Sequence, residues 1–257
     1  PLGAAVALLY RLAGQTMSAV FAPTEQVAGR FGPGRAVILQ NFPRLAEFPD
    51  LETVPLAAPS EPPIFVYVGD LTEARGVEEM LAAARLVAGD GFRLRLGGRI
   101  STPKVARLLE DGARPGNVDW LGWIDRQQLP AVLGSATAGL CVIGNYRSYR
   151  EAQPVKVYEY MAMGLPVIAS DFAEWRARFG EIGCTIFVDP HEPAAIASAM
   201  RILAKNPHYA HQMGCRGREA ALSQYNWSKQ ADKLLDTYTL IARNIANPFH
   251  RQQRPKK

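Results

Sequence analysis

The stretch EAQPVKVYEYMAMGLPVIASD, residues 151–171, carries two carboxylates eight positions apart, Glu151 and Glu159. Pro154 lies between them, and proline suits the first turn of a helix because it fixes φ and has no N–H to leave unpaired. The sequence therefore predicts a helix over about residues 154–163 that contains Glu159, with Glu151 on the loop before it.

A glycine and a short apolar run close this stretch. Gly164 is placed to end the helix, and residues 166–169, Pro-Val-Ile-Ala, are typical of a short buried strand. The free N–H groups at the start of such a helix form an anion site. Two acids and an anion-binding helix start between strands of an α/β sheet indicate a site for a sugar joined to a phosphate.

Strands and helices alternate regularly on both sides of this stretch. The run IFVYV, residues 64–68, is continuously β-branched and aromatic, as in a central parallel strand. Strands followed by helices imply right-handed crossovers and a doubly wound parallel sheet. Such sheets bind ligands at the carboxyl ends of their strands. The expected strands are residues 64–68, 92–96, 118–121, 139–143, 166–169 and 185–188.

The run PVKVYEYMAMGLPVIA, residues 154–169, together with Glu151 resembles the E-x7-E signature of retaining, nucleotide-sugar-dependent glycosyltransferases, most like glycosyltransferase family 4. The resemblance implies an α/β fold of the GT-B type, whose C-terminal domain binds a UDP- or GDP-sugar. It also implies transfer of that sugar, with retention, to a sugar or lipid-linked acceptor of the bacterial polysaccharide or glycoconjugate type. The nucleotide sugar is the substrate, and no cofactor is expected.

The same resemblance assigns roles to residues of this stretch. Glu159 would bind the ribose hydroxyls of the nucleotide, and Glu151 would lie beside the transferred sugar as the catalytic carboxylate. The helix start at Pro154, Val155 and Lys156 would receive the diphosphate. The sequence contains no D-x-D motif and no cluster of metal ligands, so we expect a metal-independent reaction.

The loop GDLTEARG, residues 69–76, resembles the family's G-R-L-x-x-x-K-G loop, whose cations neutralise the donor diphosphate. Arg75 falls on the lysine position and keeps its charge, whereas Asp70 falls on the arginine position and reverses it. A carboxylate there would repel the diphosphate. Either another cation compensates, with Lys156 and Arg99 as candidates, or Asp70 points away.

Glycines and a turn at three strand ends complete the expected donor site. Gly69, Gly97 and Gly98 permit close backbone approach, either to the ligand or only within tight turns. The residues LGWI, ending at Ile124, resemble the family's L-G-x-v turn, at which backbone atoms receive the nucleobase. Within this turn we interpret Trp123 as a packing residue.

The chain divides into five expected segments. Its first part resembles the end of an N-terminal acceptor domain, and because the chain begins with Pro1 rather than Met we expect a truncated remnant. A self-contained helical extension is the alternative. The segments are the acceptor-domain remnant, 1–43; a Pro- and Ala-rich linker, 44–63; the nucleotide-sugar-binding domain, 64–225; a terminal helix crossing back to the N-terminal domain, 226–247; and a basic tail, 248–257.

The composition is that of an ordinary globular protein, with 48% hydrophobic and 21% charged residues among 257. The net charge of +5 comes largely from four basic residues in the last seven, so no nucleic-acid-binding face is expected. The widely spaced Cys141, Cys184 and Cys215 favour a reduced, cytoplasmic setting. The basic tail suggests peripheral contact with anionic lipid at the inner face of the membrane.

The predicted function is therefore sugar transfer, with this chain supplying mainly the donor site. We expect the chain alone to lack transferase activity, because the acceptor must be held against the donor by the other domain. We also expect dimerisation through the apolar faces of residues 2–12 and of the terminal helix. Two alternatives stay open: a non-catalytic nucleotide-sugar-binding or regulatory module, and a GT-B nucleotide-sugar epimerase.

Overall fold

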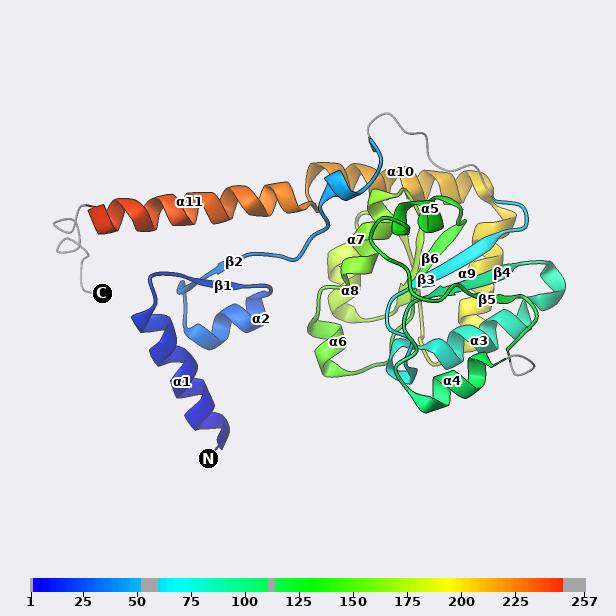
Figure 1. The fold of residues 1–257 in the computed structure, drawn as a ribbon, viewed down its shortest axis with the longest axis horizontal. Helices are drawn as coiled ribbons and strands as arrows, with labels where there is room; N and C mark the ends of the chain where they lie inside the picture. Colours follow the sequence, from blue (N-terminus) through cyan, green and yellow to red (C-terminus); the bar gives the residue numbers. More distant parts are fainter. Residues whose placement is uncertain (1, 52–59, 111–113, 247–257) are drawn as a thin grey trace. The chain divides into compact units, whose positions relative to one another are not determined.

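The computed structural model describes residues 2–51, 60–110 and 114–246. The chain forms two compact units, one of Pro1–Phe42 with Asn226–Lys257 and a larger one of Pro43–Tyr225 (Figure 1). The predicted basic tail and the middle of the predicted linker lie outside the described residues.

The larger unit is built on a six-stranded sheet. Its strands are β3 (Ile64–Val68), β4 (Arg93–Gly97), β5 (Val118–Trp120), β6 (Ala138–Cys141), β7 (Val167–Ser170) and β8 (Thr185–Val188). They lie in the order β5-β4-β3-β6-β7-β8, and every neighbouring pair is parallel. The chain winds outward from β3 to one edge and then from β6 to the other (Figure 1). The predicted doubly wound parallel sheet is confirmed, and its order reverses between β3 and β6.

Helices cover the two faces of this sheet (Figure 1). They are α3 (Val77–Leu86), α4 (Pro103–Leu109), α5 (Leu129–Gly134), α6 (Arg147–Glu151), α7 (Val155–Ala162), α8 (Ala173–Phe179), α9 (Pro193–Lys205) and α10 (Pro207–Ser223). Phe65 and Tyr67, alternate residues of β3, belong to one buried core with α3, α4 and α9. Alternation along the strand leaves the other face to α7 and its neighbours.

Tyr160 fixes α7 against the sheet. Its hydroxyl lies 3.3 Å from the carbonyl oxygen of Leu140 and 3.3 Å from the backbone nitrogen of Val68. Its ring lies so close to Gly139 that a Cβ there would come within 2.3 Å of it. The helix that carries Glu159 is therefore anchored to β3 and β6, the strands between which the order reverses.

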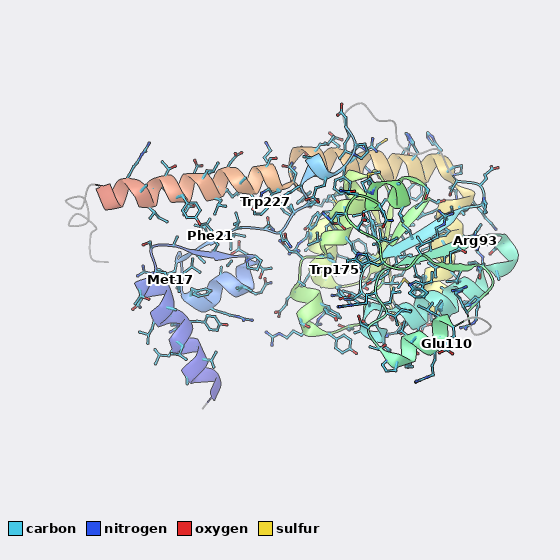
Figure 2. The ribbon with its side chains drawn as sticks, viewed as in Figure 1. Met17, Phe21, Arg93, Glu110, Trp175 and Trp227 are labelled. Atoms are coloured by element: carbon cyan, nitrogen blue, oxygen red, sulfur yellow. The ribbon has the colours of Figure 1, made fainter. Side chains whose placement is uncertain are left out.

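An aromatic cluster holds the other side of α7. The ring of Tyr158 lies 5.4 Å from that of Phe179, which in turn lies 6.5 Å from Trp175. All three side chains are buried (Figure 2 labels Trp175). Because buried aromatic rings contribute large apolar areas, this cluster ties α7 firmly to α8.

Most predicted boundaries agree with the structure to within two residues, but Glu151 was placed wrongly. It ends α6 instead of lying on a loop. Two backbone N–H groups, of Tyr149 and Arg150, donate to the carbonyl oxygen of Tyr146 and close a helical turn. Arg147 then pairs with Glu151 four residues later, a spacing that favours a helix.

The smaller unit contains α1 (Leu2–Thr16), β1 (Val20–Ala22), α2 (Glu25–Ala28), β2 (Ala36–Ile38) and α11 (Trp227–Ala246). The two strands form a parallel pair, and the Thr24 side chain caps α2 by accepting from the backbone N–H of Val27. The ring of Phe21 lies 6.1 Å from that of Tyr238, so α11 contacts β1.

The two long helices of the smaller unit expose apolar side chains, as the sequence led us to expect. Leu8 and Leu9 of α1 and Leu235 and Leu240 of α11 are each more than half exposed. None of the helices in the described part of the chain is both long and apolar enough to cross a membrane.

Candidate functional site

The candidate site lies at the carboxyl ends of β3, β4 and β5, where the loops leaving these strands are joined to one another. The backbone N–H of Gly69 donates to the carbonyl oxygen of Gly97 at 2.9 Å. The N–H of Gly98 donates to the carbonyl oxygen of Gly122 at 2.7 Å. The three loops thus form one continuous edge, at the position where sheets of this kind bind their ligands.

The predicted glycines are required by the contacts between these loops. Gly98 has a φ of 136°, and a Cβ on it would lie 1.9 Å from the carbonyl oxygen of Gly69. A Cβ on Gly97 would lie 2.6 Å from Cγ1 of Ile124. Side chains at these positions would push the loops apart, so the structure places Gly69, Gly97, Gly98 and Ile124 together.

Lys156, near the start of α7, brings a cation to this edge. Its Nζ lies 3.8 Å from the centre of the Tyr67 ring. A Cβ on Gly69 would come within 2.8 Å of the same Nζ. Burial, together with the positive charge of Arg75, lowers the pKa of Lys156 to about 8. The ammonium is therefore fixed in place, charged at neutral pH and ready to lose its proton in mild alkali.

The start of α7 offers backbone donors beside this cation. Pro154 occupies the cap position without an N–H, and no side chain caps the helix. The N–H of Val157 is already satisfied by the carbonyl oxygen of Pro154. The earlier N–H groups, of Val155 and Lys156, are the ones that a helix start presents to an anion.

Arg75 and Asp70, the two charged positions of the first loop, are each beside a partner. The guanidinium of Arg75 lies 4.6 Å from the centre of the Tyr149 ring. Nη2 of Arg99 lies 3.6 Å from Oδ1 of Asp70, and both side chains are exposed. Of the two cations that could compensate for Asp70, Arg99 is therefore the one paired with it.

Glu159 is a buried carboxylate held by an arginine that the sequence analysis missed. Arg126 donates to Oε1 of Glu159 and also to Oε2 of Glu47. Glu47 belongs to the segment interpreted as a linker, which thus supplies a side chain to the site. The signal that could have drawn attention to Arg126 is its position two residues after Ile124, in the loop expected to receive the nucleobase.

Glu151 occupies a separate part of this edge. Its Oε1 accepts from Nε of Arg147 at 2.7 Å. The same short helix carries Tyr149, on whose ring Arg75 lies, so α6 adjoins the loop after β3. The structure therefore links Glu151 to the neighbourhood of Arg75 and Glu159 to Arg126.

Trp123 is not the packing residue that we expected. Its side chain is 69% exposed, in the turn just before Ile124. The tryptophan that does contact this edge is Trp120, whose Nε1 donates to the carbonyl oxygen of Gly98 at 3.3 Å. β5 ends at Trp120, so Trp123 lies beyond the last residue that the sheet fixes.

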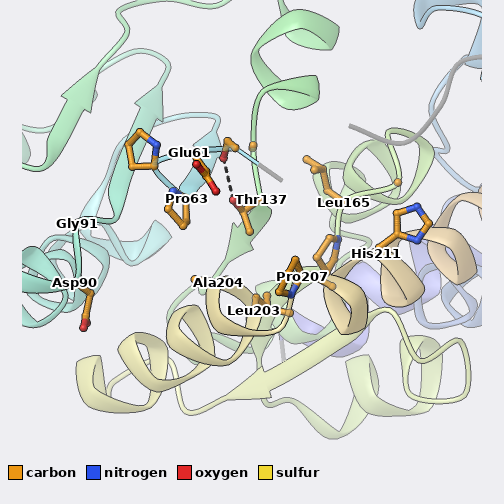
Figure 3. A pocket seen from close by; sticks show the side chains of 16 residues that line it. Glu61, Pro63, Asp90, Gly91, Thr137, Leu165, Leu203, Ala204, Pro207 and His211 are labelled. Carbon is orange, nitrogen blue, oxygen red and sulfur yellow. Dashed lines mark hydrogen bonds between the residues drawn. The ribbon is translucent and has the colours of Figure 1, made fainter. Parts of the chain in front are cut away.

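A hollow lies at the opposite edge of the sheet. This cavity, of about 420 Å³, is lined by residues just before the strands begin, including Pro63 before β3 and Thr137 before β6. Figure 3 shows it between these residues and Leu203, Pro207 and His211. Its lining is largely apolar, and it includes none of the predicted site residues.

Among residues 2–51, 60–110 and 114–246 there is no group of three or more His, Cys, Asp or Glu side chains that could hold a metal ion. The cations at the carboxyl edge come instead from lysine and arginine. Such groups bind phosphate oxygens directly, arginine through a planar fork and lysine as a point charge.

The chain superposes on solved structures of the GT-B fold, and it covers part of that fold. The chain belongs to the family described as glycosyl transferases group 1, whose model matches residues 50–220. Sucrose-phosphate synthase from Thermosynechococcus elongatus superposes with a TM-score of 0.69 at 21% identity, over 90% of this chain and 61% of that one. HepE from Anabaena, solved with UDP and glucose, gives a TM-score of 0.68 at 13% identity, over 91% and 66%.

Curated relatives are synthases and transferases of sugars. An alpha-maltose-1-phosphate synthase of Mycolicibacterium smegmatis is 27% identical over 197 residues, covering 70% of this chain and 48% of the relative. The D-rhamnosyltransferase WbpZ of Pseudomonas aeruginosa is 30% identical over 168 residues, covering 63% and 41%. The chain spans about half the length of the curated relatives that it matches.

Proposed function

We propose that this chain is the nucleotide-sugar-binding part of a retaining, metal-independent glycosyltransferase that acts on a sugar or lipid-linked acceptor. The observation that carries the proposal is the position of Lys156. Its ammonium lies against Tyr67 and Gly69, at the carboxyl edge of the sheet and at the start of the helix that bears Glu159. Solved relatives in complex with UDP or UDP-glucose support a nucleotide sugar as the ligand class.

The diphosphate is the part of the donor that this edge would hold most strongly. Lys156 and Arg75 supply two positive charges, and the first N–H groups of α7 supply uncharged donors. Arg99 offsets the negative charge of Asp70, which would otherwise repel the phosphates. Arg99 thereby compensates in part for the departure from the family's arginine at position 70.

The nucleoside and the sugar would lie on either side of the diphosphate. Glu159 would accept hydrogen bonds from the ribose hydroxyls, with the nucleobase against the backbone around Ile124. Glu151 would lie by the transferred sugar, since its helix adjoins the loop that carries Arg75. A carboxylate can accept from two hydroxyls at once, which suits it to both tasks.

Transfer would break the bond between the anomeric carbon and the diphosphate oxygen and form a bond from the acceptor oxygen to that carbon, while the acceptor hydroxyl passes its proton to the departing diphosphate. Negative charge then grows on the departing diphosphate. Lys156, Arg75 and the helix N–H groups would stabilise that charge because they are already in place before the bond breaks. Retention of configuration is proposed from the family resemblance alone.

Titration calorimetry with UDP, GDP and their glucose or mannose conjugates tests this proposal. The wild-type chain should bind at least one of these nucleotides. Lys156→Met should weaken its binding at least about tenfold, the scale of one lost charge-assisted hydrogen bond. Arg201→Met, which alters an arginine paired with Asp90 away from the site, is the matched control and should bind normally. Absence of heat with all of the nucleotides would overturn the proposal.

A further inference from the structure

Arg126 is hydrogen-bonded to two carboxylates from distant parts of the chain. Its Nε donates to Oε2 of Glu47 at 3.0 Å, and its Nη2 donates to the same oxygen. Its Nη1 donates to Oε1 of Glu159. The partners are separated from Arg126 by 79 and 33 positions, so three segments of the larger unit converge on one guanidinium.

The three side chains differ in exposure. That of Glu159 is only 11% exposed, whereas those of Glu47 and Arg126 are 34% and 55% exposed. A carboxylate this deeply buried is unfavourable unless it is paired and hydrogen-bonded. Arg126 supplies that pairing from the solvent side, and Glu47 in turn fixes Arg126.

This arrangement determines which way the Glu159 carboxylate faces. An ionised carboxylate has about four acceptor positions on its two oxygens, and Arg126 uses one of them on Oε1. The other positions stay available to hydroxyl donors. Without Glu47, the long arginine side chain could turn toward the diphosphate, because a guanidinium binds phosphate as readily as carboxylate.

We propose that Arg126, anchored by Glu47, is a positioning residue that holds the Glu159 carboxylate ready for the ribose hydroxyls of the nucleotide. The inference rests on the proposed function and deepens it. It attributes the preference for ribose over deoxyribose to three hydrogen-bonded residues: Glu47 holds Arg126, and Arg126 orients Glu159. A residue with this role contributes through the hydroxyls of the ribose and leaves the binding of the phosphates unchanged.

The test compares UDP with 2′-deoxy-UDP, and GDP with 2′-deoxy-GDP, by titration calorimetry. The wild-type chain should prefer the ribonucleotide about tenfold, which corresponds to one hydrogen bond to a charged group. In Arg126→Met the preference should fall to about twofold or less. The affinity for the deoxy form should fall less than that for the ribo form, because the deoxy ligand lacks the 2′-hydroxyl and keeps only the 3′-hydroxyl as a donor to Glu159.

Two further variants keep the comparison interpretable. Glu47→Gln removes the anchoring charge from a partly exposed side chain, and it should reduce the ribose preference even if Arg126→Met does not fold. Arg201→Met, which also removes an arginine paired with an aspartate, should keep the full preference.

The possible results separate this inference from the proposed function. An undiminished ribose preference in both Arg126→Met and Glu47→Gln overturns the positioning role and leaves nucleotide binding intact. Equal losses of affinity for the ribonucleotide and the deoxyribonucleotide also overturn the positioning role, since they indicate a general structural effect. If the wild-type chain binds none of these nucleotides, both proposals fall.

Discussion

Lys156 and Tyr67 form the closest contact between a cation and an aromatic ring at the carboxyl edge, with Nζ 3.8 Å from the ring centre. The hydroxyl of Tyr67 donates to the carbonyl oxygen of Asp70 at 3.0 Å, which fixes the ring from its far end. An ammonium over a ring face is stabilised electrostatically, yet burial still lowers the pKa of Lys156 to about 8. Its charge is therefore sensitive to pH within an accessible range.

We predict that nucleotide affinity falls as the pH rises through about 8, the pKa of Lys156 in the unliganded protein. Above this pH the neutral Lys156 amine must take up a proton before it can pair with the diphosphate. The affinity for the nucleotide should therefore fall by up to about tenfold per pH unit. The phosphates themselves are fully ionised there, since their last pKa is near 6. Calorimetry from pH 7 to pH 9.5 measures this slope. Lys156→Met should abolish it, and an identical slope in the variant would assign the titration to another group.

The stability of the unliganded protein should respond in the opposite direction. The unfolded chain keeps the Lys156 proton up to the ordinary pKa of 10.5, whereas the folded chain releases it near 8. Between these values the unfolded state binds more protons, so the contribution of Lys156 to the free energy of unfolding rises with pH. Urea unfolding of wild type and Lys156→Met should give a difference that shifts in favour of wild type over this interval. A constant difference would mean that the pKa is not lowered.

We predict that the two glutamates divide the donor between them. Glu159→Ala should weaken the binding of UDP or GDP by about 1–3 kcal/mol, the range for hydrogen bonds to a charged group. Glu151→Ala should leave the affinity for the free nucleotide unchanged and lower only the affinity for the nucleotide sugar. Calorimetry with both ligand forms separates these effects. Parallel losses in both variants would show that the roles are not divided in this way.

Gly98 should tolerate no side chain. A Cβ at this position would lie 1.9 Å from the carbonyl oxygen of Gly69, and the φ of 136° is unfavourable for other residues. Gly98→Ala should lower the free energy of unfolding by about 2–4 kcal/mol and displace the loops of the site. Gly89→Ala is the matched control, because nothing lies within 4 Å of its added Cβ. Urea unfolding measures both, and equal stability of the two variants would contradict the packing described for this edge.

Asp70 should oppose diphosphate binding. We expect Asp70→Asn to tighten UDP or GDP binding about two- to fivefold at low salt, because exposed charges interact by up to about 1 kcal/mol. The gain should shrink as salt is added. Asp90→Asn, at the opposite edge, is the control. Weaker binding by Asp70→Asn would instead show that Asp70 assists the ligand by holding Arg99.

The strands of the larger unit were predictable because their sequences are continuous apolar runs. Residues 64–68 and 185–188 were placed without error. The strand expected at 139–143 ends at Cys141, although Val142 and Ile143 are just as buried. Burial is visible in the sequence as hydrophobicity, but the point at which pairing with the neighbouring strand stops is not.

The candidate site was predictable where one short segment carries it and not where distant segments meet. Lys156 and Glu159 share one helix with a recognisable sequence. Arg126 is hydrogen-bonded to Glu47, 79 positions away, and no local sequence pattern predicts such a pair. Trp123 was misjudged for a related reason, because its exposure depends on where the strand before it ends.

Hydrogen–deuterium exchange with and without nucleotide tests the central claim, that the ligand binds at the carboxyl edge of the sheet. With saturating UDP or GDP, amide exchange should slow in the loop of residues 69–76 and at the start of α7, Val155–Lys156. The backbone amides of residues that line the cavity at the opposite edge, among them Leu203 and His211, should exchange at the same rate in both states. Protection of that cavity with no change at residues 69–76 and at the start of α7 would contradict the account.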